Sequence, residues 1–297
     1  MSEAVASAPA GTNVLQCPIC GGAEARRVWR ERGVELLRCL GCGHVRSTWQ
    51  AGPDYAGYWG DSAVSENSLA AHSDYWYRAR VPVYREFLRR FSAYCGRLLD
   101  VGCGIGFFVK VARDAGWDAH GSEVSPVAVR IGREQLGLAQ LHVGRVEDAG
   151  FVQGSFDAIT LWDVIEHVPD PVSLLIELRR LLRPGGLLFV QTPNVNMQLL
   201  RARVVRCMRG KDEGCNTLEV KDHLNDFTPG SLRLAVQRAG YAHSRVFVLL
   251  PTFSLAGGRG RFGVAAKLGW YGLARGVFVL SGRRLHISNT IHLAAWA

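Results

Sequence analysis

The sequence predicts an α/β fold built on a doubly wound sheet, preceded by a small cysteine-rich unit. Three observations support this prediction. Short apolar runs alternate with helical stretches between Leu98 and Asn194, which is the pattern of a sheet with helical crossovers. The first run ends in a glycine-rich turn that opens a helix. Two Cys-x-x-Cys pairs lie nearer the N-terminus.

The composition fits a domain with a full core. The chain has 297 residues, of which 48% are hydrophobic, enough for one doubly wound domain and a small extra unit. The formal net charge of +9 leaves nucleic acid, an anionic membrane surface and phosphorylated substrates open as partners. Residues Met1–Asn13 lack the apolar segment of a secretory signal, and no apolar run is long enough to span a membrane. We therefore expect a cytoplasmic protein, in solution or peripheral to a membrane.

The cysteine-rich unit predicts a zinc ribbon over residues 14–50. Its two knuckles, CPICG and CLGCG, let each pair of thiolates face one ion across a tight turn. Four thiolates would close the coordination shell, so the ion is expected to be structural. Two disulfides or a redox pair are the alternatives; the missing secretory signal argues against the first, and the presence of four cysteines against the second. The expected zinc ligands are Cys17, Cys20, Cys39 and Cys42.

Other residues of this unit have simpler expected roles. Strands are expected at Arg27–Trp29 and Glu35–Arg38, between the two knuckles. His44 could compete as a zinc ligand, but we expect it at the surface. The cysteines without a knuckle partner are expected to be free thiols: Cys95, Cys103, Cys207 and Cys215.

The glycine-rich turn follows the apolar run that ends at Asp100. Its glycines permit positive φ angles and let a ligand lie against bare main chain. An acid in the turn suits a ligand with a cationic amine, whereas phosphate sites of the related type have no fixed anion there. The residues expected to contact the ligand are Asp100, Gly102, Cys103, Gly104, Gly106 and Phe107.

The turn sequence DVGCGIG resembles motif I of the class I S-adenosylmethionine (SAM) methyltransferases. FDAITLWDVIEHVPDP resembles the fourth-strand segment of the same family, LLRPGG is another of its hallmarks, and HLNDFTPGSL resembles a segment of its small-molecule members. With a four-cysteine ribbon before a type 11/12-like core, the chain resembles a bacterial group that modifies sugars, glycolipids or natural products. The resemblance implies SAM as cofactor and a seven-stranded, Rossmann-like methyltransferase sheet with an antiparallel last strand.

The elements after the turn come in the order of this fold. Helix Phe107–Ala115 precedes strand Asp118–Glu123, whose final acid is expected to accept from the ribose hydroxyls of SAM, or else to be a surface acid. A buried strand at Ala158–Leu161 is expected to place Trp162 and Asp163 against the methionine and adenine parts of the cofactor. Further elements are expected at Val172–Leu182 (helix), Leu187–Gln191 (strand), Thr228–Gly240 (helix with caps), and Tyr241–Leu249 and Ile291–Trp296 (strands).

The expected domains are the ribbon at 14–50, an aromatic-rich helical linker or lid at 51–94, and the methyltransferase domain at 95–297. The aromatic residues of the linker either shape the acceptor site or pack on the sheet. Insertions are expected near 195–227 and 251–284. Within the second, the apolar helix Val264–Leu280 either lies on an anionic membrane or caps the core.

The favoured function is methyl transfer to a small-molecule acceptor, on a hydroxyl of a sugar, glycolipid or secondary metabolite. The alternatives are an RNA base methyltransferase that uses the ribbon to recognise RNA, a sugar C-methyltransferase, and a non-catalytic SAM-binding protein. The candidates for the general base are His167, His223 and Asp163. Backbone bonding at a helix start is the alternative role for His167, and ligand positioning is the alternative for Asp163. The sequence does not indicate an oligomeric state.

Overall fold

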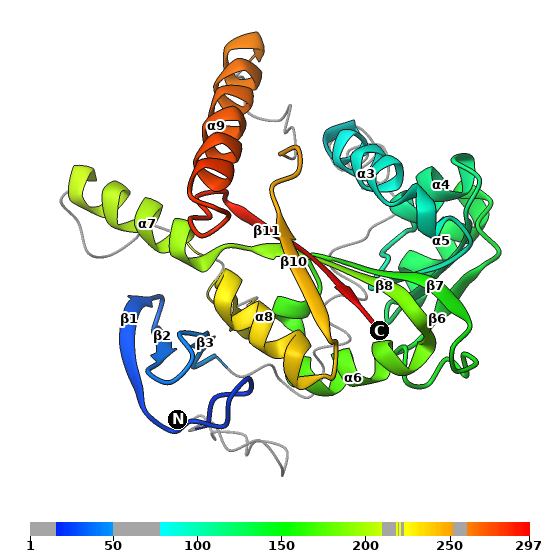
Figure 1. The fold of residues 1–297 in the computed structure, drawn as a ribbon, viewed down its shortest axis with the longest axis horizontal. Coiled ribbons are helices and arrows are strands. Elements are labelled where there is room, and N and C mark those ends of the chain that lie inside the picture. The colour runs from blue at the N-terminus through cyan, green and yellow to red at the C-terminus, as the bar shows by residue number, and fades with distance from the viewer. Residues whose placement is uncertain (1–15, 50–77, 210–217, 219, 221–222, 252–259) are drawn as a thin grey trace, which may run out of the picture.

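The computed structural model describes residues 16–49, 78–209, 218, 220, 223–251 and 260–297. Its centre is a seven-stranded sheet of order β10-β11-β8-β7-β4-β5-β6 (Figure 1). Neighbouring strands from β8 to β6 are parallel, whereas β11 is antiparallel to both β8 and β10. The predicted sheet with an antiparallel last strand is thus confirmed. The strands are β4 (Arg97–Val101), β5 (Asp118–Glu123), β6 (Leu141–Val143), β7 (Phe156–Trp162), β8 (Leu182–Pro193), β10 (His243–Phe247) and β11 (Thr290–Trp296).

Helices cover both faces of this sheet (Figure 1). Successive residues of a strand point to opposite faces, so Leu188 and Val190 of β8 join the core under α6 and α8, whereas Phe189 joins the core under α3 and α4. The described helices are α3 (Arg78–Arg90), α4 (Phe107–Asp114), α5 (Pro126–Leu136), α6 (Pro171–Leu181), α7 (Val195–Arg209), α8 (Pro229–Arg238) and α9 (Gly260–Leu280), with short 3-10 turns η2 (Ser92–Tyr94) and η3 (Ile165–His167). None of the described helices is long and apolar enough to cross a membrane.

Three helices begin where the sequence signals predict. Ser125, Asp170 and Thr228 each accept a backbone N–H of the first turn through the side chain, and a proline follows each cap. Such caps satisfy N–H groups that have no partner within the helix, and proline at the first position lacks that donor. The predicted bounds of two of these helices, Val172–Leu182 and Thr228–Gly240, agree with α6 and α8 to within one or two residues.

The N-terminal unit forms a second sheet of order β1-β2-β3-β9. Its strands are β1 (Ala25–Glu31), β2 (Val34–Cys39), β3 (Val45–Ser47) and β9 (Asn225–Asp226), each antiparallel to its neighbour. The fourth strand therefore comes from the part of the chain that forms the seven-stranded sheet, between α7 and α8. The two predicted ribbon strands are present, but the sequence did not predict β3 or its pairing with β9.

The surface position expected for His44 is wrong. The residue is 1% exposed, its ring lies 4.9 Å from that of Phe227, and its Nε2 lies 2.9 Å from Asn225 Oδ1. His44 directly precedes β3, so the pairing of β3 with β9 buries it between the two units of the chain.

The predicted linker and insertions are described only in part. Residues 50–77 lie outside the described residues, but the final part of the linker is α3, where Tyr84 and Phe87 are buried in the core. The segment 195–227 contains α7 and β9, and 251–284 contains α9. Cys215 lies outside the described residues, whereas Cys95, Cys103 and Cys207 are free thiols.

Candidate functional site

The glycine-rich turn joins β4 to α4 and needs glycine at three positions. Gly102, Gly104 and Gly106 have φ angles of +67°, +56° and +89°, a region that residues with a Cβ rarely adopt. A Cβ on Gly102 would lie 2.7 Å from Val164 Cγ2, whereas one on Gly104 would meet no described atom within 4 Å. The main chain at Gly104 therefore borders open space, where a ligand can approach it.

Asp100 provides a buried carboxyl at the start of this turn. It is 3% exposed and accepts a 2.7 Å hydrogen bond from Thr160 Oγ1 on the neighbouring strand β7. The pKa of Asp100 is raised to about 8, chiefly by burial and also by the Glu123 carboxylate, against the opposing hydrogen bond from Thr160. A cationic ligand group would compensate the charge of this carboxylate, so the position favours a bound amine.

Glu123 ends the adjacent strand β5 and reaches the same turn. Its Oε2 accepts from Gly104 N at 2.9 Å and its Oε1 from Ser125 N at 3.0 Å. Each carboxylate oxygen has a further lone pair, so Glu123 can hold the turn and still accept from two ligand hydroxyls. The structure thus brings Asp100, the glycines and Glu123 together as the sequence predicts.

Cys103 and Phe107 are the other two residues that were predicted to contact the ligand at the turn. The Cys103 thiol occupies the space that Gly121 leaves open, since a Cβ at Gly121 would lie 2.5 Å from Cys103 Sγ. Burial raises the pKa of Cys103 well above its ordinary value, which keeps it a neutral thiol. Phe107 is half-buried at the first position of α4.

Trp162 ends strand β7 and Asp163 follows it, but the two residues differ in their surroundings. The Trp162 ring lies 4.8 Å from that of Tyr84 and 4.9 Å from that of Phe189, and only 6% of the residue is exposed. Asp163 has a φ of +56°, and its Oδ2 accepts from Arg80 Nη2 at 2.6 Å and from Gln191 Nε2 at 3.0 Å. Trp162 therefore packs with the aromatic core, while Asp163 presents a carboxylate between α3 and the sheet.

Two histidines predicted as base candidates lie together beyond the end of β7. The rings of His167, in η3, and His223, which precedes β9, lie 5.0 Å apart. His223 Nδ1 lies 3.5 Å from Asp226 Oδ1. His167 is half-buried and His223 is buried, so His167 is the more accessible of the two.

Glu166 completes this cluster and was missed by sequence reasoning. It is 1% exposed; its Oε2 accepts from Thr192 Oγ1 at 3.0 Å, and its Oε1 has no hydrogen-bond partner among the described residues. Burial raises the pKa of Glu166 to about 8, with the Asp163 carboxylate adding to the shift. Ligand atoms of Glu166, His167 and His223 all lie within 4.8 Å of one another, a donor set suited to a divalent metal ion. The adjacent acid and histidine after strand β7 were the signal that could have found it.

The four cysteines of the N-terminal unit converge on one point. Cys17 Sγ lies 3.6 Å from Cys42 Sγ, Cys20 Sγ lies 3.5 Å from Cys39 Sγ, and all four sulfurs lie within 4.8 Å of one another. Thiolates around tetrahedral zinc, with Zn–S bonds of about 2.3 Å, lie about 3.8 Å apart. The observed spacing therefore fits one zinc ion.

Short hydrogen bonds connect this unit to the histidine cluster. Asn225 accepts from His44 and donates to Val168 O at 2.7 Å, next to His167. Leu224 N donates to Glu166 O at 2.9 Å, and Ser47 N donates to Leu224 O at 3.1 Å. The segment that carries His223 is thus held by the N-terminal unit on one side and by η3 on the other.

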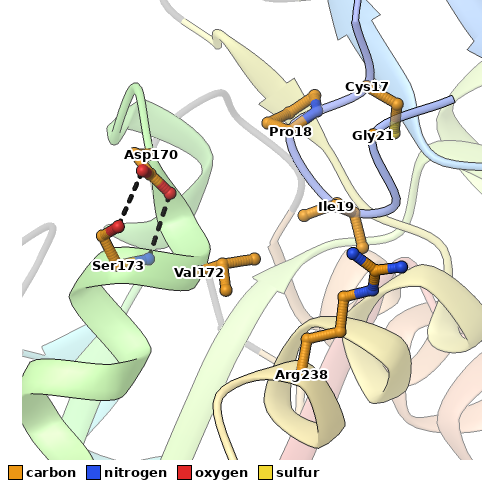
Figure 2. A pocket seen from close by; sticks show the side chains of 8 residues that line it. All are labelled: Cys17, Pro18, Ile19, Gly21, Asp170, Val172, Ser173 and Arg238. Carbon is orange, nitrogen blue, oxygen red and sulfur yellow. Dashed lines mark hydrogen bonds between the residues drawn. The ribbon is translucent and has the colours of Figure 1, made fainter. Parts of the chain in front are cut away.

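A separate cavity of about 410 Å³ lies between the first cysteine knuckle and helices α6 and α8 (Figure 2). Asp170 faces it and is occupied in capping α6, since its carboxylate accepts from Ser173 N and Ser173 Oγ. Cys17 is the one predicted site residue in its lining, so this cavity is distinct from the glycine turn. The lining residues are Cys17, Pro18, Ile19, Gly21, Asp170, Val172, Ser173 and Arg238.

The comparison with protein families decides the identity of the larger unit. A family model described as "Methyltransferase domain" matches residues 75–244, more than half of the chain. The chain belongs to the methyltransferase-domain family. This methyltransferase domain contains the glycine turn, Asp100, Glu123 and the two histidines within the matched residues.

Curated relatives match part of the methyltransferase domain. A ubiquinone biosynthesis O-methyltransferase of Xanthomonas oryzae pv. oryzae is 39% identical over 103 residues, which cover 33% of this chain and 43% of the relative. One of the same name from Methylococcus capsulatus is 31% identical over 130 residues, covering 42% of this chain and 55% of the relative. The chain spans about half the length of the curated relatives it matches.

Solved structures share the fold of the methyltransferase domain. Phosphoethanolamine N-methyltransferase 2 of Haemonchus contortus, in complex with phosphomonomethylethanolamine and S-adenosylhomocysteine, matches with a TM-score of 0.54 and 17% identity, over 81% of this chain and 60% of that chain. A SAM-dependent methyltransferase from Archaeoglobus fulgidus matches with a TM-score of 0.50 and 14% identity, over 78% of this chain and 100% of that chain. At these identities the likeness concerns the fold.

Proposed function

We propose that this protein is a SAM-dependent methyltransferase that methylates a hydroxyl group of a small molecule. The observation that carries the proposal is the meeting of Asp100 and Glu123, from adjacent strands, around a glycine turn with open main chain. The curated relatives support the class of reaction, since their name describes O-methylation of a small molecule.

In this proposal, the ends of β4 and β5 bind the cofactor. SAM, when bound, supplies an electrophilic methyl group. The Asp100 carboxylate pairs with the ammonium of the methionine part, and Glu123 accepts from the ribose hydroxyls while it holds Gly104 in place. Asp163 lies at the end of the next strand and positions the ligand from the side of α3.

His167 is the proposed general base. With SAM and acceptor bound, the imidazole would take the proton of the acceptor hydroxyl, so that the methyl group would pass to oxygen without a high-energy alkoxide and S-adenosylhomocysteine would be the leaving group. His167 suits this role better than His223 because it is the more exposed of the pair. His223 and Glu166, both buried, lie beside His167 and are proposed to fix its orientation.

The four-cysteine unit is proposed to hold one structural zinc ion. The sulfur spacing fits tetrahedral coordination, and four thiolates leave no position for a substrate or an activated water. The acceptor class remains that expected from the sequence resemblance, a hydroxyl of a sugar, glycolipid or secondary metabolite, to which the relatives' name adds quinone precursors as a first screen.

Calorimetric titration with S-adenosylhomocysteine tests the cofactor site. Glu123→Gln is expected to weaken binding by roughly tenfold or more, because the amide loses acceptors for both main chain and ribose. Asp114→Ala is the control, since Asp114 is an exposed acid on α4 that pairs with Lys110. Equal affinity of the wild type and Glu123→Gln, or no binding by the folded wild type, would overturn the assignment.

Methyl transfer from labelled SAM to an acceptor panel tests the reaction. His167→Gln is expected to lower kcat by about a hundredfold while S-adenosylhomocysteine affinity stays unchanged. Unchanged kcat in this variant would remove His167 from the role of base.

A further inference from the structure

The excess of positive over negative charge lies in the C-terminal part of the chain. The sequence contains no Asp or Glu after Asp226, whereas nine Lys and Arg residues follow it. Residues 227–297 therefore hold a formal charge equal to the whole net charge of +9, and the preceding residues are balanced. Such an asymmetry points to an anionic partner for this part of the molecule.

Helix α9 exposes apolar side chains within this basic region. Among its described side chains only Ala274 and Phe278 are buried, and the helix extends away from the sheet (Figure 1). Leu273 is 53% exposed and Leu280 is 89% exposed. The other exposed apolar side chains of α9 and the loop after it are Leu268, Trp270, Val279 and Leu285. Isolated exposed apolar residues are ordinary, but several of them gathered on one helix mark an interaction surface.

Helix α7 adds a second face of the same kind. Val195–Arg209 contains no acidic residue, and its exposed apolar side chains, Leu200, Val204 and Met208, alternate with arginines. Asn194, just before α7, donates from its backbone N–H to Asn289 O and from its side-chain amide to Ser288 O, so the start of α7 is tied to the segment that follows α9. We call α7, α9 and the loop 281–285 the cationic apolar surface.

This surface adjoins the edge of the sheet that carries the proposed site. Strand β11 is antiparallel to β8, and Thr290 at its start pairs with Pro193 at the end of β8. Helix α9 therefore returns to the sheet where α7 leaves it. Gln191, next to this point, donates to Asp163. A partner held by α7 and α9 would lie on the acceptor side of the domain.

We propose that the cationic apolar surface binds an anionic membrane, with α9 lying in the headgroup region. Arginines at the interface attract anionic headgroups, and exposed Leu, Val and Trp side chains enter the acyl boundary. The aliphatic side chains favour lipid over nucleic acid, which offers phosphates and stacked bases and no apolar phase. Membrane binding would also present the site to a lipid-linked acceptor, an extension that rests on the proposed function.

Vesicle flotation tests the surface directly. The protein is mixed with vesicles of phosphatidylcholine alone or of phosphatidylcholine with phosphatidylglycerol, at low and high salt. We expect binding only to the anionic vesicles, weakened by salt. The double variant Arg283→Glu, Arg284→Glu is expected to bind at least about tenfold more weakly, because each charge contributes to the attraction. The double variant Leu273→Gln, Leu280→Gln is expected to lose binding to a similar extent.

Matched controls lie elsewhere on the methyltransferase domain. Ile176→Gln changes an exposed apolar residue on α6, and Arg89→Glu reverses an exposed charge on α3; both are expected to bind as the wild type does. All substituted side chains are exposed, so each variant is expected to fold. Thermal unfolding midpoints check this. Equal binding to neutral vesicles, loss of binding in the controls to the same extent, or salt-dependent binding of RNA with none to vesicles would overturn the proposal. S-adenosylhomocysteine titration of the same samples reports separately on the proposed function.

Discussion

Replacing His44 with Phe tests the connection between the N-terminal unit and the methyltransferase domain. Asn225 Nδ2 donates to Val168 O, so its Oδ1 faces His44 and the proton must lie on His44 Nε2. Phe keeps the ring contact with Phe227 but removes this donor. His44→Phe therefore leaves the Asn225 carbonyl oxygen buried without its partner.

The expected loss of stability is about 1–3 kcal/mol, the cost of a buried acceptor left unsatisfied. The lower half of that range is favoured, because the variant also removes His44 Nδ1, which has no hydrogen-bond partner among the described residues. His44→Gln is the matched variant, since its side-chain amide can donate from about the position of Nε2. Urea unfolding at pH 7, with zinc content measured on each sample, gives the free energies.

The same variant predicts a dependence on pH. Burial lowers the pKa of His44 to about 4, whereas an unfolded histidine titrates near about 6.5. Below pH 6.5 the unfolded wild type takes up a proton that the folded protein excludes, so the wild type loses stability as pH falls towards 4. His44→Phe lacks this titration, so its deficit shrinks over the same range. Equal urea midpoints for the wild type and His44→Phe at pH 7, or a deficit that grows at low pH, would refute the reasoning.

Three further predictions address the glycine turn, the buried carboxyl and the cysteines. Gly102→Ala introduces a Cβ at φ +67° and 2.7 Å from Val164, so it should lower the thermal midpoint and abolish S-adenosylhomocysteine binding; a stable variant that still binds would contradict the turn geometry. Asp100 has a raised pKa of about 8 and pairs best with an amine when ionised, so calorimetric affinity should increase as pH rises towards 8, and a flat profile would argue against the pairing. Cys42→Ser should reduce bound zinc measured by elemental analysis to well below the wild-type content, and equal content would exclude the four-thiolate site.

The sheet and the glycine turn with its two acids could be predicted because local sequence determines them. The glycines, Asp100 and Glu123 belong to turns and strand ends whose geometry depends on neighbouring residues, and the order of elements then fixes which strand ends meet. Helix caps such as Thr228 are local in the same way.

The cluster of Glu166, His167 and His223 was harder to predict because distant segments build it. Glu166 can be recognised as a candidate site residue only when His223 lies beside it. His223 belongs to a segment 57 residues further along the chain. His44 looked like a surface residue because nothing nearby in the sequence shows that β9 will cover it. A two-residue strand has too short a hydrophobic pattern to predict which strand it pairs with.

The pairing of β3 with β9 also sets an order for events during synthesis. The cysteine knuckles and β1 to β3 leave the ribosome long before Asn225 and Asp226, which complete their sheet. Until then β3 is an open edge, and the thiolates can take up metal while their unit still lacks its fourth strand. A fragment that ends before β9 would keep that edge open permanently, so an N-terminal unit cut out as a zinc module would expose β3 to pairing with other chains unless residues 223–227 were supplied.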